Sequence, residues 1–417
     1  MRKVRHNELL RKDDEVSFLF QPKGFEKPVG LKDLLPDAVA KLRAIQQAVI
    51  SCMTTWGYRE VMTPTLEYYD TVGAASATPD HKLFKLLDRK GQTLVLRPEM
   101  TAPIARVVAS MMRTVKHPIR LSYHANVFRA PEEEAGRDAE FFQTGVELIG
   151  DASAEADAEV IALAVASLHA VGVADFKLSI GHLGFLNGVL QEALPGDANE
   201  QDALKSLLLQ RNLVGFSDRL RHMKIDPAQS KRLNELTRLR GSVAVCDSAA
   251  KLTNDKTALA ALEHLRNVWL ALEDYGVTDS VMLDLTMIGD FSYYTGVVFE
   301  GYSNALGFPL CNGGRYDQLY DQFDRPAPST GFALKANRIL ELWNKQAAPV
   351  EAPIVIVYDE VSRSVAFLRA RELRSSCSRP VITYAVTDSD RAGFSEANLL
   401  VQFNASEVES FFGGTGK

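Results

Sequence analysis

The first half of the chain alternates between two hydrophobic patterns, one with the period of a helix and one with the period of a strand. Residues 37–56 repeat apolar side chains every three or four positions up to Gly57, which predicts a long helix that ends at a glycine. Residues 58–70 have strand character around Pro64, and residues 83–96 alternate about a central turn, which predicts a β-hairpin.

Two more strand-like segments flank an acidic loop. Aromatic and β-branched residues mark strands near 121–128 and 141–149, and three consecutive glutamates occupy the turn-like loop between them. An alanine-rich helix with acidic residues in its first turns follows at about 153–172, and then a short strand at 176–180. Residues 121–180 are therefore predicted to form a β-hairpin, followed by a helix and a further strand.

The second half adds helices, further strands and a small tail. Its charge-rich helical stretch is divided by glycines, which predicts a helical insertion over residues 187–275. We divide the rest into a charged leader at 1–23, a core built from 24–186 and 276–345, and a small α/β C-terminal domain at 346–417.

Composition narrows the class of protein. The 417 residues are 46% hydrophobic and 24% charged, which is typical of a globular protein. No apolar run reaches the roughly 18 residues of a membrane span, and residues 1–14 lack the apolar core of a signal peptide, so we expect a cytoplasmic protein without a membrane partner. The four scattered cysteines indicate neither a disulfide framework nor a metal site, and a net charge of −6 gives no global attraction for nucleic acid.

Polar residues at strand positions mark a candidate site. Gln143 and Glu147 are four residues apart, so on one strand they point to the same face, and Arg129 ends the strand before them. A face with an arginine, an amide and a carboxylate suits a zwitterion, with its carboxylate on Arg129 and its ammonium on Glu147. A solvated amphipathic hairpin would carry the same residues, so this pattern leaves both interpretations open.

The hairpin resembles motif 2 of class II aminoacyl-tRNA synthetases, in particular that of the histidyl-tRNA synthetases. It keeps Phe128 and Arg129 before the loop, and Phe141 and Gln143 after it. Inside the loop, glutamates at 132–134 replace family residues that grip ATP. Each carboxylate would repel a phosphate by about 1 kcal/mol at ~4 Å in water, so the resemblance implies a kept fold with damaged ATP binding.

Other segments resemble the same family in the same order. The long helix and the strand around Pro64 resemble motif 1, which builds the class II dimer interface. An Arg-Pro-Glu-x-Thr element brings Glu99 and Thr101, which in the family contact the histidine substrate, although both residues would also suit a helix cap with a solvated glutamate. A segment like the family's histidine-recognition strand supplies Tyr293 and Tyr294.

Further differences from the synthetase pattern lie at positions that activate the amino acid with ATP. Gly289 stands where the family has an arginine that stabilises the transition state, a contribution typically worth about 100-fold or more in rate. In the segment like motif 3, Lys335 and Asn337 replace a glycine and a glutamate, while Arg338 is kept. The tail also looks shorter than the family's anticodon-reading domain.

The resemblance implies an α+β fold, a class II aminoacyl-tRNA synthetase-like antiparallel sheet flanked by helices, with a helical insertion and a small C-terminal α/β tail. The family contains the synthetase, a pseudo-synthetase domain that senses tRNA, and the regulatory subunit of ATP phosphoribosyltransferase. Since the matches fall on histidine recognition and the losses on activation, we favour the regulatory subunit over a divergent histidine–tRNA ligase or a tRNA-sensing module.

This hypothesis implies a protein without catalytic residues, cofactor or metal. It implies a motif 1 dimer that regulates a short-form ATP phosphoribosyltransferase catalytic subunit, and no binding of tRNA. Histidine is the expected ligand, and a relic pocket that is kept for stability and binds nothing is the alternative. The expected ligand-binding residues are Glu99, Thr101, Arg129, Gln143, Glu147, Tyr293 and Tyr294.

Overall fold

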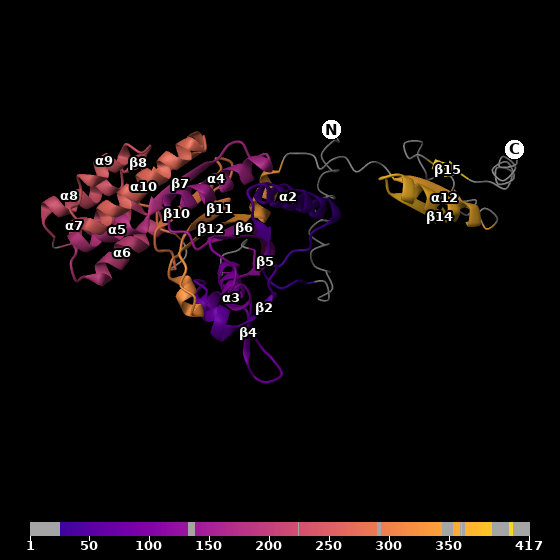
Figure 1. Cartoon of the computed structure of the whole chain (residues 1–417), viewed down its shortest axis with the longest axis horizontal. Coiled ribbons are helices and arrows are strands. Elements are labelled where there is room, and N and C mark those ends of the chain that lie inside the picture. Colours follow the sequence, from indigo (N-terminus) through magenta and orange to yellow (C-terminus); the bar gives the residue numbers. More distant parts are fainter. Residues whose placement is uncertain are drawn as a thin grey trace, which may run out of the picture. The chain divides into compact units, whose positions relative to one another are not determined.

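The computed structural model describes residues 26–131, 138–223, 225–289, 293–343, 353–358, 360, 363–385 and 400–402. The chain separates into two compact units, Met1–Asn344 and Lys345–Lys417 (Figure 1). The predicted leader and the three glutamates at 132–134 lie outside the described residues.

A nine-stranded sheet, counted within the described residues, forms the centre of the larger unit, in the order β1-β5-β6-β12-β11-β10-β7-β9-β8. Its long inner strands pair antiparallel, which confirms the predicted fold class, whereas β1–β5 and β7–β9 near the two edges pair parallel. The strands are β1 Arg59–Glu60, β5 Ile119–Phe128, β6 Glu140–Ile149, β7 Lys177–His182, β8 Arg240–Gly241, β9 Val281–Asp284, β10 Val297–Tyr302, β11 Cys311–Arg315 and β12 Ser329–Lys335.

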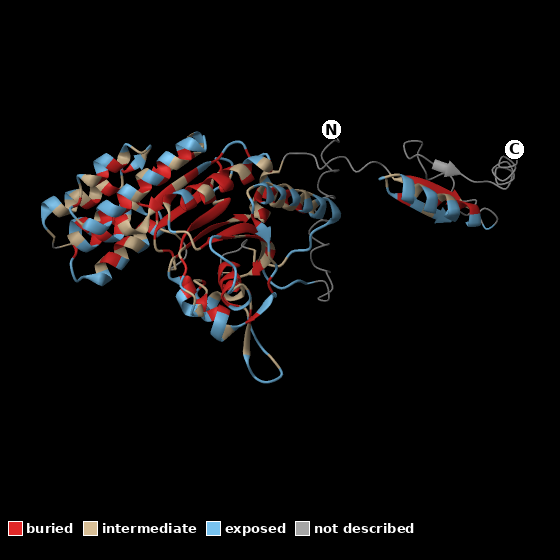
Figure 2. Cartoon of the chain, in the orientation of Figure 1, coloured by how far each residue is buried: buried red, intermediate tan, exposed pale blue. Residues whose placement is uncertain are grey.

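Helices pack against this sheet, which is buried along most of its length (Figure 2). The predicted long helix is α2, whose apolar stripe is buried and which is followed by Gly57 with a φ of 84°, a left-handed value that favours glycine. The Ser153 hydroxyl accepts a hydrogen bond from the backbone N–H of Ala156 and so caps α4. The helices around the sheet are α2 Pro36–Thr55, α3 Thr101–Met111, α4 Ala154–Ala170 and α11 Ala336–Leu342.

The predicted strand at residues 58–70 is wrong as a single element. Its first part is β1 in the large sheet, while its second part is β2 (Leu66–Tyr68), which pairs with β4 (Thr93–Leu96) in a three-stranded sheet completed by β3 (Lys85–Leu87). Pro64 lies at the break, where a residue without an N–H costs no ladder bond. The Arg97 guanidinium holds this break through the carbonyl of Thr63, at 2.8 Å.

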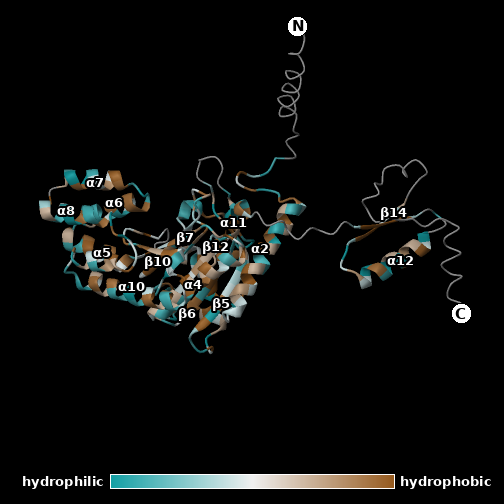
Figure 3. Ribbon diagram, turned by 90° about the horizontal axis from the view of Figure 1, so that it is seen from above, coloured by the Kyte–Doolittle hydropathy of each residue, from teal (hydrophilic) through white to brown (hydrophobic). Residues whose placement is uncertain are grey.

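Six helices, counted within the described residues, cover the stretch predicted as a helical insertion, and they gather at one end of the sheet (Figures 1 and 3). Side-chain oxygens of Asp197, Asn212, Asp226 and Asp255 accept backbone N–H groups at the starts of α6, α7, α8 and α10, which explains why one charge-rich stretch forms separate helices. These helices are α5 Leu183–Ala193, α6 Ala198–Leu209, α7 Leu213–His222, α8 Pro227–Leu236, α9 Val245–Ala250 and α10 Lys256–Asp274.

Short helical turns complete the larger unit, at Tyr69–Gly73, Asp80–Lys82, Thr278–Ser280 and Leu319–Phe323. The smaller unit has a parallel sheet in the order β14-β13-β15, and its predicted strand–helix–strand order is confirmed. Its elements are β13 Ile354–Tyr358, α12 Arg363–Ser376, β14 Val381–Ala385 and β15 Leu400–Gln402. Within the described ranges, no helix is both long and apolar enough to cross a membrane.

Candidate functional site

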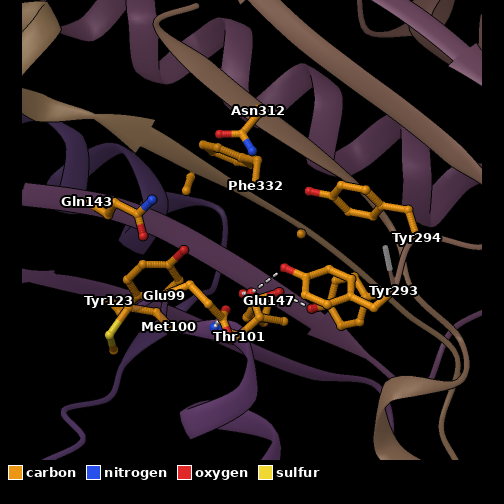
Figure 4. A pocket seen from close by; sticks show the side chains of 13 residues that line it. Glu99, Met100, Thr101, Tyr123, Gln143, Glu147, Tyr293, Tyr294, Asn312 and Phe332 are labelled. Carbon is orange, nitrogen blue, oxygen red and sulfur yellow. Dashed lines mark hydrogen bonds between the residues drawn. The ribbon is translucent and has the colours of Figure 1, made fainter. Parts of the chain in front are cut away.

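A small pocket opens on one face of the large sheet, and its floor is set by the register of three adjacent strands. Glu147 of β6 pairs with Gly331 of β12, and Ala333 of β12 pairs with Asn312 of β11. Because directly paired residues project to the same side of a sheet, these side chains share one face. The lining comprises Glu99, Met100, Thr101, Tyr123, Gln143, Glu147, Tyr293, Tyr294, Asn312, Tyr316, Gly331, Phe332 and Ala333 (Figure 4).

The pocket gathers six of the seven residues predicted from the sequence, from separate segments of the chain. These are Glu99, Thr101, Gln143, Glu147, Tyr293 and Tyr294, whereas Arg129 does not line it. Among the polar lining residues that the sequence analysis missed are Tyr123, Asn312 and Tyr316. Tyr316 directly follows strand β11, in a Gly-Gly-Arg-Tyr-Asp sequence that resembles the synthetases and was a usable signal. Asn312 lies immediately before that sequence, whereas nothing local marks Tyr123.

Glu147 is the central polar group of the pocket and is only 2% exposed. Thr101 Oγ1 donates to its Oε1 at 2.9 Å, and the Tyr316 hydroxyl donates to its Oε2. Burial raises the pKa of Glu147 well above its ordinary range, the Thr101 hydroxyl opposes this, and the nearby Glu99 charge adds to it. A buried acid with a raised pKa becomes a strong partner for an ammonium group, since the incoming cation restores its charged form.

Glu99 caps helix α3 from inside the pocket. Its carboxylate accepts the backbone N–H groups of Thr101 and Ala102 at 2.6 and 3.0 Å. The predicted cap by Thr101 is wrong, because that hydroxyl is used on Glu147, and the alternative of a solvated glutamate is also wrong, because Glu99 is 2% exposed. Burial raises the pKa of Glu99, while the two N–H groups and the Arg129 charge oppose that rise.

Arg129 lies beside the pocket and contacts both the segment before α3 and its own hairpin. Its Nε donates to the carbonyl of Pro98 at 2.8 Å, and its guanidinium lies 5.2 Å from the ring centre of Phe141. Its charge partly opposes the rise in the pKa of Glu99 that burial causes. The structure therefore supports an electrostatic effect of Arg129 on the pocket.

The pocket is narrow. Its open volume is about 20 Å³, room for one or two water molecules. The predicted histidine-sized cavity is therefore not open in this conformation, and an amino acid can enter only if lining side chains move. Tyr293 and Tyr294, which stand edge to face 5.1 Å apart, directly follow residues 290–292, which lie outside the described part.

Residues that align with the ATP-handling residues of the synthetases make structural contacts in this chain. A Cβ added to Gly289 would lie 2.5 Å from Cδ2 of Tyr294, so the tyrosine ring occupies the space that a side chain there needs. Arg338 donates to the carbonyl of Pro309 at 2.7 Å and lies 5.0 Å from the ring centre of Phe308. Across the described residues, no group of three or more His, Cys, Asp or Glu side chains is placed to hold a metal ion.

Comparison with known proteins places this chain in a family. A family model described as histidyl-tRNA synthetase matches residues 30–339. The ATP phosphoribosyltransferase regulatory subunit of Bacillus licheniformis is 46% identical over 378 residues, covering 91% of this chain and 95% of that protein. The protein of the same description from Bacillus subtilis is 44% identical and covers 92% and 98%.

Solved structures agree. The crystal structure of an ATP phosphoribosyltransferase regulatory subunit/histidyl-tRNA synthetase from Bacillus halodurans matches with a TM-score of 0.81 and 40% identity, covering 94% of this chain and 97% of that one. Histidyl-tRNA synthetase from Nostoc sp. PCC 7120 matches with a TM-score of 0.72 and 20% identity, covering 94% and 90%, a likeness of fold alone.

Proposed function

Because this chain belongs to the family of ATP phosphoribosyltransferase regulatory subunits, with its histidyl-tRNA synthetase-like fold, we propose that it binds histidine in the pocket around Glu147 and controls a short-form catalytic subunit of that enzyme. In this role the chain carries out no chemistry itself. It is needed for the partner's full activity and makes the first step of histidine biosynthesis sensitive to its end product.

One contrast within the site carries the proposal. The residues proposed to bind the amino acid are in place, with Glu147 buried and accepting hydrogen bonds from Thr101 and Tyr316. The activation face is filled, since Tyr294 packs against Gly289 where a transition-state cation would have to stand. A pocket that keeps ligand groups and lacks catalytic ones suits binding and regulation.

A ligand regulates only through different affinities for two states, so a non-catalytic binder has to act on another chain. Mixing this protein with a short-form ATP phosphoribosyltransferase catalytic subunit should raise the rate of phosphoribosyl-ATP formation. Histidine should then inhibit the mixture more strongly than it inhibits the catalytic subunit alone. The two proteins should co-elute on a sizing column.

The measurement needs two controls, the catalytic subunit alone and the same subunit with an unrelated protein at equal concentration. If the rate stays at the level of the catalytic subunit and the proteins elute separately, the proposed partner is wrong. If activation occurs and histidine has no added effect, the partnership holds and the histidine role fails.

The proposal includes a dimer formed through the motif 1 surface, defined here by Met62 and Leu66 on either side of Pro64. Met62 is 84% exposed and Leu66 is 45% exposed, so both apolar side chains are accessible to a second copy of the chain. Met62→Glu should convert a wild-type dimer into a monomer without loss of fold, as measured by sedimentation velocity, because its charge would be buried without a partner.

Val214, on helix α7 of the insertion, offers a matched control because it is an apolar residue with 74% exposure far along the chain from motif 1. Val214→Glu should remain dimeric. A wild-type monomer, or a Met62→Glu protein that stays dimeric, would place the interface elsewhere.

A further inference from the structure

A buried ion pair lies behind the pocket, on the opposite face of the large sheet. Gly314 pairs with Gly331 in the pocket floor, and because side chains alternate along a strand, Arg315 projects to the other side. There it reaches both oxygens of Asp157 in α4, with Nε donating to Oδ2 at 3.0 Å and Nη2 lying 3.0 Å from Oδ1. Both residues are less than 5% exposed. Since removing one partner of a buried pair strands the other charge, this pair fixes β11 against α4.

Helix α10 of the insertion shares the same carboxylate. His264 Nε2 lies 2.8 Å from Asp157 Oδ2, and since an ionised carboxylate only accepts, the imidazole is the donor. The His264 ring stands edge to face with His182, 5.6 Å away between centres. Burial lowers the pKa of His182 to about 4, so this ring is neutral at pH 7, and its Nδ1 accepts the N–H of Gly184 at the start of α5. The first and last helices of the insertion therefore meet the core at one cluster.

Arg315 also fixes the chain that borders the pocket. Its carbonyl accepts the N–H of Thr295 at 2.8 Å, and its Nη1 donates to Asp317 Oδ1 at 3.1 Å. The N–H of Asp317 in turn donates to Thr295 Oγ1 at 3.0 Å. Between these two anchored residues, Tyr316 turns to the pocket side and donates its hydroxyl to Glu147. The position of Tyr316 is therefore set by the contacts of the residues on either side of it.

We propose that His264, Asp157 and Arg315 form a positioning network, through which helix α10 of the insertion sets the place of Tyr316 and thereby the ligand affinity of the pocket. The inference rests on the proposed function for its ligand, histidine, and gives the helical insertion a role in that function. Without the His264 donor, Oδ2 of Asp157 is held by Arg315 alone, so the carboxylate turns and the guanidinium shifts with it. A shift of Arg315 moves Tyr316, its neighbour in sequence, relative to Glu147.

Hydrogen exchange of the whole chain, measured without ligand, tests the network itself. The N–H groups of Thr295 and Tyr316 donate to the carbonyls of Arg315 and Ser329, both at 2.8 Å, and so report on the chain around the pocket. His264→Leu should speed the exchange of these two amides by about 3- to 30-fold, the range of coupling that substitutions along such networks produce. His264→Gln keeps a side-chain N–H donor and should exchange like wild type.

Calorimetry with histidine tests the consequence for binding. His264→Leu should weaken binding by about 3- to 30-fold, and Tyr316→Phe should weaken it as well. The double variant should lose no more than Tyr316→Phe alone, because the hydroxyl that the network positions is then already absent. His222→Leu, the same change at an exposed histidine of α7, is the matched control and should behave like wild type in both measurements. His264→Ala replaces the leucine variant if that protein does not melt cooperatively.

The possible failures are distinct. Faster exchange that stays confined to α4 and α10 in His264→Leu overturns the inference, since that pattern marks a local structural role. Additive losses of histidine affinity in the double variant also overturn it, because the effect then bypasses Tyr316. If wild type binds no histidine while Thr295 and Tyr316 exchange faster in His264→Leu, the network stands and the histidine role of the proposed function fails.

Discussion

Glu147→Ala should weaken histidine binding by about 100-fold or more, because a ligand ammonium would then be buried in the pocket without its carboxylate partner. The residue is 2% exposed and accepts hydrogen bonds from the Thr101 and Tyr316 hydroxyls. Calorimetry of wild type and variant gives the affinities. Glu60→Ala, at an exposed position of β1, is the matched control and should bind like wild type.

The same carboxyl group should make binding depend on pH. Burial raises the pKa of Glu147 in the empty pocket, so the group carries a proton there until well above the ordinary range for a glutamate. An arriving ammonium stabilises the carboxylate and lowers that pKa, so binding releases a proton and affinity rises with pH between the two pKa values. Calorimetry in buffers of different ionisation enthalpy measures the proton, and Glu147→Gln should abolish it.

Unchanged affinity in Glu147→Ala would move the histidine site away from this pocket. If Glu147→Ala loses affinity but wild type releases no proton on binding, the histidine site is supported and the protonated state of Glu147 in the empty pocket is contradicted. Thermal melting of each variant separates both outcomes from loss of fold, because a buried carboxyl that is removed leaves a cavity that also lowers stability.

Neither the wild-type protein nor Gly289→Arg should catalyse histidine-dependent exchange of pyrophosphate into ATP. A Cβ at position 289 would lie 2.5 Å from Cδ2 and 2.9 Å from Cε2 of Tyr294, so the arginine has to displace the tyrosine from the pocket. The missing cation accounts for about 100-fold or more in rate, but restoring it leaves Lys335 and Asn337 in motif 3 unchanged. The expected gain of activity is therefore nil.

Gly289→Arg should instead weaken histidine binding, because Tyr294 lines the pocket and moves when arginine enters. Gly307→Arg is the matched control, since a Cβ there meets nothing within 4 Å, and it should bind and melt like wild type. Exchange above background in the wild-type protein would favour the divergent histidine–tRNA ligase. Exchange that appears only in Gly289→Arg would show that one residue separates the two functions.

The sequence by itself determined most of the elements and the family. The period of apolar residues marked α2 and its glycine end, and alternation marked the hairpin β5–β6, because local backbone geometry fixes which side chains share a face. Glu99, Gln143 and Glu147 were predicted for the pocket because each lies in a motif whose order along the chain resembles the synthetases. These signals are local, so they can be recognised without knowledge of the fold.

Only the tertiary structure decided which residues complete the pocket. Asn312 and Tyr123 reach it from strands β11 and β5. Strand pairing, which no local spacing encodes, places Tyr123 beside Gly145 and Asn312 beside Ala333. The break at Pro64, the contact of Arg129 with the Pro98 carbonyl and the packing of Tyr294 on Gly289 also depend on segments far apart in sequence. A side chain's partner is set by register and close packing across the sheet, and these exist only after the chain has folded.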